Sequence, residues 1–218
     1  MDGKTDLTGK MAAEFVGTLA LIYVGVLVLT SGSESGLVGA ALAHGLTIAV
    51  MASATMAVSG GHLNPAVTLG ALVGRRISIQ DALAYVVAQL AGGMLGAFLA
   101  RRSLPGGDIA GGLPGLGPGM TTGSAILVEA VLTFFLMFVI FGTAIDNRFG
   151  GRIGGLGIGF AVAIGVFAGG PLTGAAMNPA RWFGPALVTQ TWEDAAVYLA
   201  GPALGAVLAT LVYTSFIM

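Results

Sequence analysis

The chain of 218 residues contains no cysteine and few charged residues. Without cysteine it forms no disulfide, no thiolate metal site and no thiol-based active site, although this absence does not indicate a compartment. Charged residues make up 9% of the chain and the net charge is −1, so the basic patch expected of a nucleic-acid-binding protein is missing. Soluble domains contain about 25% charged residues. This chain has too few to cover a water-exposed surface.

The chain is instead rich in apolar and small residues. It is 56% hydrophobic, has a mean hydropathy of +0.92 and contains 37 glycines. Glycine lets transmembrane helices approach each other closely, so this composition predicts a tightly packed helical bundle in a membrane. The motifs Gly-x-Ser-x-Gly and His-Glu-x-x-His do not occur in the sequence. We therefore expect no enzyme active site, and no bound metal or cofactor.

Six apolar segments are long enough to span a membrane, since about 20 residues cross about 30 Å of hydrocarbon. They cover residues 11–30, 38–57, 82–100, 123–145, 154–170 and 194–216. The first has no clear cleavage site and is interpreted as a retained helix rather than a signal peptide. The longest break, residues 101–122, is rich in glycine and proline and joins two halves of three spans each.

Lysine and arginine predict the orientation, because loops rich in them stay on the cytoplasmic side. With the N-terminus inside, six basic residues fall on the cytoplasmic side, namely Lys4, Lys10, Arg75, Arg76, Arg148 and Arg152. Only Arg101 and Arg102 fall outside. We therefore expect both termini in the cytoplasm. The short tails, which carry no targeting extension, favour a prokaryotic plasma membrane.

The two halves of the chain repeat each other. Glu14 and Thr18 of the first half correspond to Glu129 and Thr133 of the second, and residues 90–97 and 199–206 share six of eight amino acids. An odd number of spans in each half places the second half upside down in the membrane. We expect one domain made of inverted repeats, about 11–100 and 123–217, joined by the loop 101–122.

Each half also contains one Asn-Pro-Ala triplet. Asparagine is a good helix N-cap and proline is favoured at the first helical position, so each triplet predicts a helix start, at Pro65 and Ala66 and at Pro179 and Ala180. The segments 64–74 and 178–188 are too short to span a membrane. We expect two half-helices that meet N-terminus to N-terminus at the midplane, with the stretches 58–63 and 171–177 lining a water-filled cavity.

The two capping asparagines suggest a barrier to protons. If the side-chain oxygens of Asn64 and Asn178 cap the half-helices, their NH₂ groups stay free to point into the cavity. A water molecule between them accepts from both amides and donates only outward, next to two positive helix ends. This arrangement interrupts a proton-conducting chain of waters and disfavours cations.

Together these motifs resemble the aquaporin (major intrinsic protein) family. The resemblance rests on the two Asn-Pro-Ala triplets, on Glu14 and Glu129, and on the run from Asn178 to Pro185, and it covers residues 11–217. It implies an all-α membrane protein with six transmembrane helices and two re-entrant half-helices in an inverted 3+3 repeat. It also implies a single-file pore in each protomer of a homotetramer in lipid, conducting water and small neutral solutes while excluding protons and ions.

The family's selectivity filter falls on His44, Val166, Ala175 and Arg181 of this chain. This set is similar to that of the plant vacuolar-type (tonoplast intrinsic) subgroup rather than to the strict water channels. Arg181 is the filter arginine, which donates to solutes and repels cations. With Val166 in place of a histidine, water is expected to pass and ammonia, urea or glycerol become plausible solutes.

The resemblance assigns roles to further residues. The backbone carbonyls of residues 60–62 and 174–176 form a ladder of acceptors for water, namely those of Gly60, Gly61, His62, Gly174, Ala175 and Ala176. Glu14 and Glu129 accept backbone N–H groups from the re-entrant loops. Leu21 and Leu136 are expected to form apolar pore wall.

Two alternatives to a water channel remain open at this point. A glycerol or urea facilitator is disfavoured by Trp182 and Ala186, which replace the Asp and Lys of glycerol channels, but Leu199 is similar to a glycerol-channel residue. A proton-coupled transporter could use the intramembrane carboxylates and the two histidines as relays.

Overall fold

The computed structural model describes residues 6–31, 36–148 and 153–218, and every regular element in these residues is helical. Six helices are long and apolar enough to cross a membrane, as the sequence predicted. They are α1 (Leu7–Thr30), α2 (Gly36–Ser59), α4 (Ile79–Ser103), α5 (Thr122–Ile140), α6 (Gly154–Thr173) and α8 (Ala195–Val212). Two shorter helices, α3 (Pro65–Val73) and α7 (Pro179–Thr189), follow the two Asn-Pro-Ala asparagines.

Four of the helices, α1, α2, α4 and α6, are longer than the apolar spans that predicted them. Asp6 caps α1 by accepting from the backbone N–H of Gly9 at 2.8 Å, and Ser78 caps α4 by accepting from Asp81 at 3.1 Å. The last turns after α5 and α8 are π-helical, η3 (Phe141–Ile145) and η4 (Tyr213–Ile217), while two 3₁₀ turns, η1 (Pro105–Gly107) and η2 (Ala110–Gly112), lie in the long loop. Hydropathy marks only the hydrocarbon-spanning part of a helix, and polar caps carry the helix beyond it.

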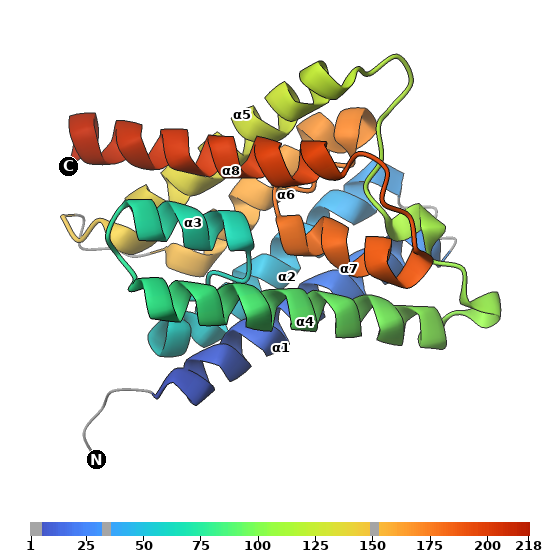
Figure 1. The fold of residues 1–218 in the computed structure, drawn as a ribbon, viewed down its shortest axis with the longest axis horizontal. Coiled ribbons are helices and arrows are strands. Elements are labelled where there is room, and N and C mark those ends of the chain that lie inside the picture. The colour runs from blue at the N-terminus through green and yellow to red at the C-terminus, as the bar shows by residue number, and fades with distance from the viewer. Residues whose placement is uncertain (1–5, 32–35, 149–152) are drawn as a thin grey trace.

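The two halves of the chain have the same arrangement of helices. Helix α1 packs against α2 and α4, α5 packs in the same way against α6 and α8, and α2 and α6 join the halves. Figure 1 shows that α4 and α8 run in opposite directions, with α3 and α7 between them. The first turn of α1 and the last turn of α8 lie toward the same end of the molecule (Figure 1).

Glycines that recur in both halves allow the close crossings. A Cβ on Gly96 of α4 would lie 2.6 Å from the carbonyl oxygen of Leu19 on α1, and one on Gly201 of α8 would lie 2.6 Å from Cβ of Glu129 on α5. Gly92 and Gly205 face their partner helices as closely. These glycines belong to the repeated segments 90–97 and 199–206, so the sequence repeat marks the points where helices touch.

Large apolar side chains cover the outer faces of the long helices. Val50, Leu83, Phe135 and Ile164 are each more than half exposed. An apolar exterior of this kind suits contact with lipid or with another subunit. The orientation relative to the cytoplasm remains a prediction, and two of the basic residues on which it rests, Lys4 and Arg152, lie outside the described residues.

Candidate pore

The loops before α3 and α7 meet through their capping asparagines. The Asn64 Oδ1 accepts from the N–H of Ala66 at 2.8 Å and the Asn178 Oδ1 accepts from that of Ala180 at 2.9 Å, as N-caps do. The Asn64 Nδ2 donates to the carbonyl of Met177 at 2.8 Å, and the Asn178 Nδ2 donates to that of Leu63 at 2.9 Å. A carboxamide NH₂ has two N–H donors. Each NH₂ therefore keeps one free N–H, not the two expected from the sequence.

The backbone of both loops is strained next to these asparagines. Leu63 has a φ of 52° and Met177 a φ of 49°, in the left-handed region that bulky residues rarely adopt. The N–H of Leu63 donates to Glu14 Oε2 at 2.6 Å, and the N–H of Met177 donates to Glu129 Oε2 at 2.7 Å. Such strain persists only where surrounding contacts hold it, and here a buried carboxylate on the neighbouring helix does so in each half.

The remaining bonds to Glu14 come from the first loop and from α4. Its Oε1 accepts from the Ser59 hydroxyl at 2.6 Å and from the His62 N–H at 2.9 Å. Its Oε2 also accepts from the Gln89 amide at 2.8 Å. Glu14 is completely buried, and these bonds compensate for the loss of hydration of its charge.

Glu129 makes nearly the same contacts in the second half. Its Oε1 accepts from the Thr173 hydroxyl at 2.7 Å and from the Ala176 N–H at 2.9 Å. In each half a tyrosine hydroxyl then donates to the end of the preceding helix, Tyr85 to the carbonyl of Ser59 and Tyr198 to that of Thr173, both at 2.8 Å. Figure 1 shows the helices carrying these tyrosines, α4 and α8, on either side of the two short helices.

A small central cavity of about 30 Å³ surrounds the meeting point of the loops. Most residues assigned to the pore from the sequence line it, namely Leu21, His44, Gly61, His62, Asn64, Leu136, Val166, Ala175, Ala176, Asn178 and Arg181. Gly60 and Gly174 do not line this cavity. Each lines one of two larger hollows beyond it.

These two hollows adjoin the central cavity at opposite ends. One, of about 410 Å³, lies near the long loop and shares Val166 and Arg181 with the cavity. The other, of about 440 Å³, lies near Lys10 and Arg76 and shares His62, Val67 and Ile140 with it. The three spaces therefore follow one another through the bundle and adjoin at these shared residues.

At Arg181 a direct hydrogen bond joins two of the residues assigned to the filter from the sequence. Arg181 Nε donates to His44 Nε2 at 3.1 Å, while His44 Nδ1 lies 2.7 Å from the carbonyl of Ala40. Since Nε2 accepts and a carbonyl can only accept, the ring is neutral with its proton on Nδ1. Arg181 is 6% exposed, and within the described residues its NH1 group has no hydrogen-bond partner. Arg181 therefore brings a buried donor without a protein partner in these residues to the wall of the cavity.

Sequence reasoning missed part of the apolar lining. The missed residues are Ile48, Val67, Ile140, Ile158 and Val162, whereas Met177 lies in the stretch 171–177 that was expected to line the cavity. Ile48 lies one helical turn after His44, Ile140 one turn after Leu136, and Val162 one turn before Val166. Residues four apart share a helix face, so this spacing from the assigned residues would have found these three.

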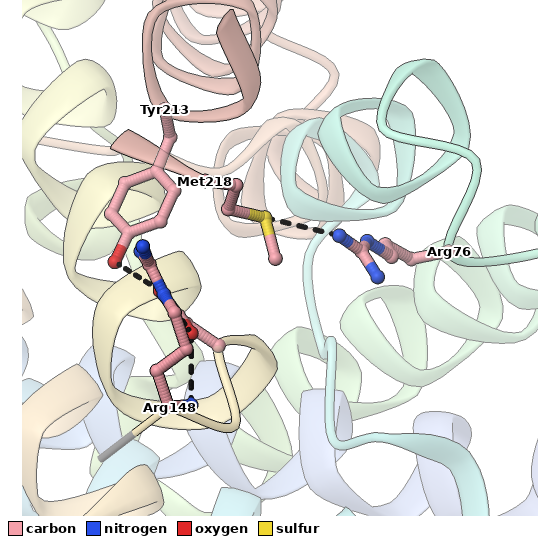
Figure 2. A network of polar contacts seen from close by, with 5 residues as sticks. Arg76, Arg148, Tyr213 and Met218 are labelled. Atoms are coloured by element: carbon pink, nitrogen blue, oxygen red, sulfur yellow. Dashed lines mark hydrogen bonds and ion pairs between the residues drawn. The ribbon is translucent and has the colours of Figure 1, made fainter. Parts of the chain in front are cut away.

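A polar cluster at the Lys10 end was also missed. Tyr213 of η4 donates to Asp146 at 3.2 Å, and the guanidinium of Arg148 donates to both oxygens of the same carboxylate (Figure 2). Nearby, Arg76 donates to the Met218 sulfur at 3.1 Å (Figure 2). The hydrogen bonds from Arg148 hold the pKa of Asp146 well below its usual range. The cluster ties the end of α8 to the loop after α5.

Comparison with known proteins identifies the family. The model of the family described as "Major intrinsic protein" matches residues 3–213. The chain belongs to the major intrinsic protein family. It is 43% identical to aquaporin TIP1-2 from Zea mays, with 94% of this chain and 85% of that protein covered. It is 40% identical to probable aquaporin TIP3-2 from Arabidopsis thaliana, with 94% and 82% covered.

A solved structure supports the fold of this major intrinsic protein. The aquaglyceroporin from Plasmodium falciparum superposes with a TM-score of 0.84 over 97% of both chains, at 23% identity. This likeness shows the aquaporin fold and leaves the solute open. The six apolar helices and the family membership together make the chain a multi-pass integral membrane protein, as expected from the sequence.

Proposed function

We propose that this major intrinsic protein is a passive channel for water, selective at His44, Val166, Ala175 and Arg181. The observation that carries the proposal is the cavity between two wider hollows, because it brings all four side chains and both capping asparagines to one path. Its relatives at 40–43% identity are named aquaporins. The apolar wall lets water pass with few fixed partners, while the asparagines and Arg181 supply donors at separate points.

Proton exclusion is assigned to Asn64 and Asn178. Each has one N–H left after bonding the opposite loop, and both caps stand at the positive ends of α3 and α7. A water held there accepts from both amides, so its own hydrogens point outward. The chain of waters therefore changes direction at this point, and a proton cannot be passed along it.

The solute filter favours water and ammonia over glycerol. Trp182, which stands where glycerol channels have an acid, is 2% exposed and stacks on Tyr198 at 5.9 Å between ring centroids. It does not line the central cavity, and Leu199 is half exposed on the outer face of α8. Neither residue supplies a polar wall for a polyol, so a glycerol or urea facilitator remains the alternative to be tested.

A proton-coupled transporter is a weaker candidate. Glu14 and Glu129 are completely buried and accept several hydrogen bonds each from the loops. Protonation would weaken these charge-assisted bonds and would place an O–H donor against groups that themselves donate. The contacts therefore favour the role of loop support.

The oligomer and the membrane are further parts of the proposal. The exposed apolar faces of the helices suit a homotetramer in lipid, with one pore in each protomer, and both termini on the cytoplasmic side. The relatives named above are plant proteins, so they lend no support to the prokaryotic plasma membrane expected from the sequence. Native mass spectrometry of the purified protein measures the subunit number.

Stopped-flow light scattering on proteoliposomes tests the function. Vesicles with and without protein are exposed in parallel to osmotic, ammonium, urea and glycerol gradients. We expect fast water flux that leaves the membrane potential unchanged and shows no dependence on a pH gradient. Vesicles that respond no faster than empty ones in every gradient would overturn the channel, and flux driven by a pH gradient would support the transporter.

A further inference from the structure

We propose that Gly25 of α1 is a positioning residue for the filter, because its missing side chain leaves the recess that seats the His44 ring. Gly25 is buried in α1. A Cβ placed on it would lie 2.5 Å from His44 Nε2, 3.0 Å from Cε1 and 3.1 Å from Cδ2. The whole outer edge of the imidazole therefore rests against the bare backbone of α1.

Two hydrogen bonds fix the His44 ring in this recess. Its Nδ1 is fixed 2.7 Å from the carbonyl of Ala40, one turn earlier on the same helix. The atom closest to Gly25, Nε2, is also the atom that accepts from Arg181 at 3.1 Å. A methyl group at position 25 would overlap this nitrogen and push the ring out of the recess. Gly25 therefore sets the position of Arg181 through His44 without touching a solute.

The second half of the chain has no such recess. The positions that correspond to Gly25 and His44 there hold Ile140 and Ile158, both buried and both lining the central cavity. Two apolar side chains fill the space that a glycine and a histidine share in the first half. The contact between a glycine and a histidine ring thus occurs at the Arg181 end of the pore and not at the equivalent positions of the second half.

The first test measures the NMR signal of the His44 imidazole directly and does not depend on a flux measurement. The chain has only two histidines, so protein labelled with ¹⁵N-histidine gives few imidazole signals, which the variant His62→Gln assigns. We expect Gly25→Ala to shift the His44 Nε2 signal as its bond from Arg181 is lost. The control Gly112→Ala, whose Cβ would lie 2.9 Å from a methyl carbon of Val26 beside Gly25, should leave that signal in place. An unchanged His44 signal in Gly25→Ala overturns the proposal.

The second test measures the consequence for permeation and rests on the proposed function. In proteoliposomes Gly25→Ala should lower water flux several-fold and change the ratio of ammonia to water flux, whereas Gly112→Ala should not. In a His44→Ala background, where the ring is gone, Gly25→Ala should have no further effect. An equal loss in both backgrounds means that the glycine acts only in helix packing and overturns the proposal.

The proposal can still be tested if the Gly25→Ala variant does not fold. If Gly25→Ala is not obtained as folded protein, the double variant Gly25→Ala, His44→Ala is purified instead. Recovery of folded protein on removing the ring supports the proposal, and failure of the double variant as well overturns it. A wild-type protein that conducts no water would refute the channel, while the His44 signal would still test Gly25.

Discussion

Asn64 and Asn178 each hold the loop that contains the other. Each amide donates to a backbone carbonyl of the opposite loop, at 2.8 Å to Met177 and at 2.9 Å to Leu63. These carbonyls belong to the residues with positive φ, whose N–H groups are held by the buried glutamates. The two halves are thus joined at the centre of the pore by a reciprocal pair of hydrogen bonds.

The first prediction concerns this pair. Asn64→Ala removes an N-cap, worth about 0.5–2 kcal/mol, and a crossing hydrogen bond worth about 1 kcal/mol. We expect a destabilisation of about 2–3 kcal/mol, seen as a lower Tm in detergent, together with proton leak in pH-sensitive vesicle assays. Asn147→Ala, at an exposed position in the loop after η3, is the matched control. Equal Tm values for the two variants would contradict the role of the pair.

The second prediction separates loop support from proton transport at Glu14. Glu14→Gln keeps the shape of the side chain but replaces one acceptor oxygen by an NH₂ group that faces donors. Hydrogen bonds to a charged group contribute about 1.5–3 kcal/mol each, so we expect a loss of at least about 3 kcal/mol in stability. Folded variant protein should retain passive water flux. Glu193→Gln, on the exposed loop before α8, should match the wild type.

Loss of a pH-driven flux in Glu14→Gln, with stability unchanged, would instead favour the transporter. The same comparison applies to Glu129→Gln. In the part of the chain that the structure describes, Glu129 has no hydrogen-bond partner equivalent to Gln89, so we expect this variant to lose less stability than Glu14→Gln.

The third prediction concerns the filter. Arg181→Val removes the fixed cation and its unpartnered NH1 donor from the cavity wall. We expect urea and glycerol flux to rise relative to water flux, because the filter becomes wider and loses its charge. His44→Phe should narrow the filter, remove the acceptor for Arg181 and reduce any ammonia flux relative to water. Parallel gradients in proteoliposomes measure both ratios, and an unaltered selectivity in Arg181→Val would count against the assigned filter.

The fourth prediction concerns pH and the cluster in Figure 2. Because Arg148 lowers the pKa of Asp146 in the folded protein, the ionised carboxylate stabilises the fold at pH values above the ordinary aspartate pKa of about 4. That contribution is lost only as the pH falls below this value. The Tm of the wild type should exceed that of Asp146→Asn by a constant amount from pH 8 to pH 5.

Below about pH 4 this difference in Tm should shrink. Asp108→Asn, which alters an exposed carboxylate in the long loop, serves as the control and should show little difference at any pH. A gap between wild type and Asp146→Asn that closes already near neutral pH would contradict the pKa shift.

The sequence by itself determined the spans, the short helices and the residue types at the pore. A run of apolar residues needs no partner to favour the bilayer, and an Asn-Pro pair starts a helix through its own side chain and ring. For this reason the six spans and the helices at Pro65 and Pro179 follow from local chemistry. The caps at Asp6 and Ser78 are equally local, although hydropathy alone did not place them.

Only the tertiary structure decided how these residues pair. His44 and Arg181 lie 137 residues apart, and the bond between them depends on α1 leaving a recess at Gly25. The crossing bonds of Asn64 and Asn178, and the fourth bond from Gln89 to Glu14, likewise join groups whose sequence neighbours give no sign of a partner. How closely the helices pack determines such contacts. A glycine in the sequence indicates where a close approach occurs only when the helix that faces it is known.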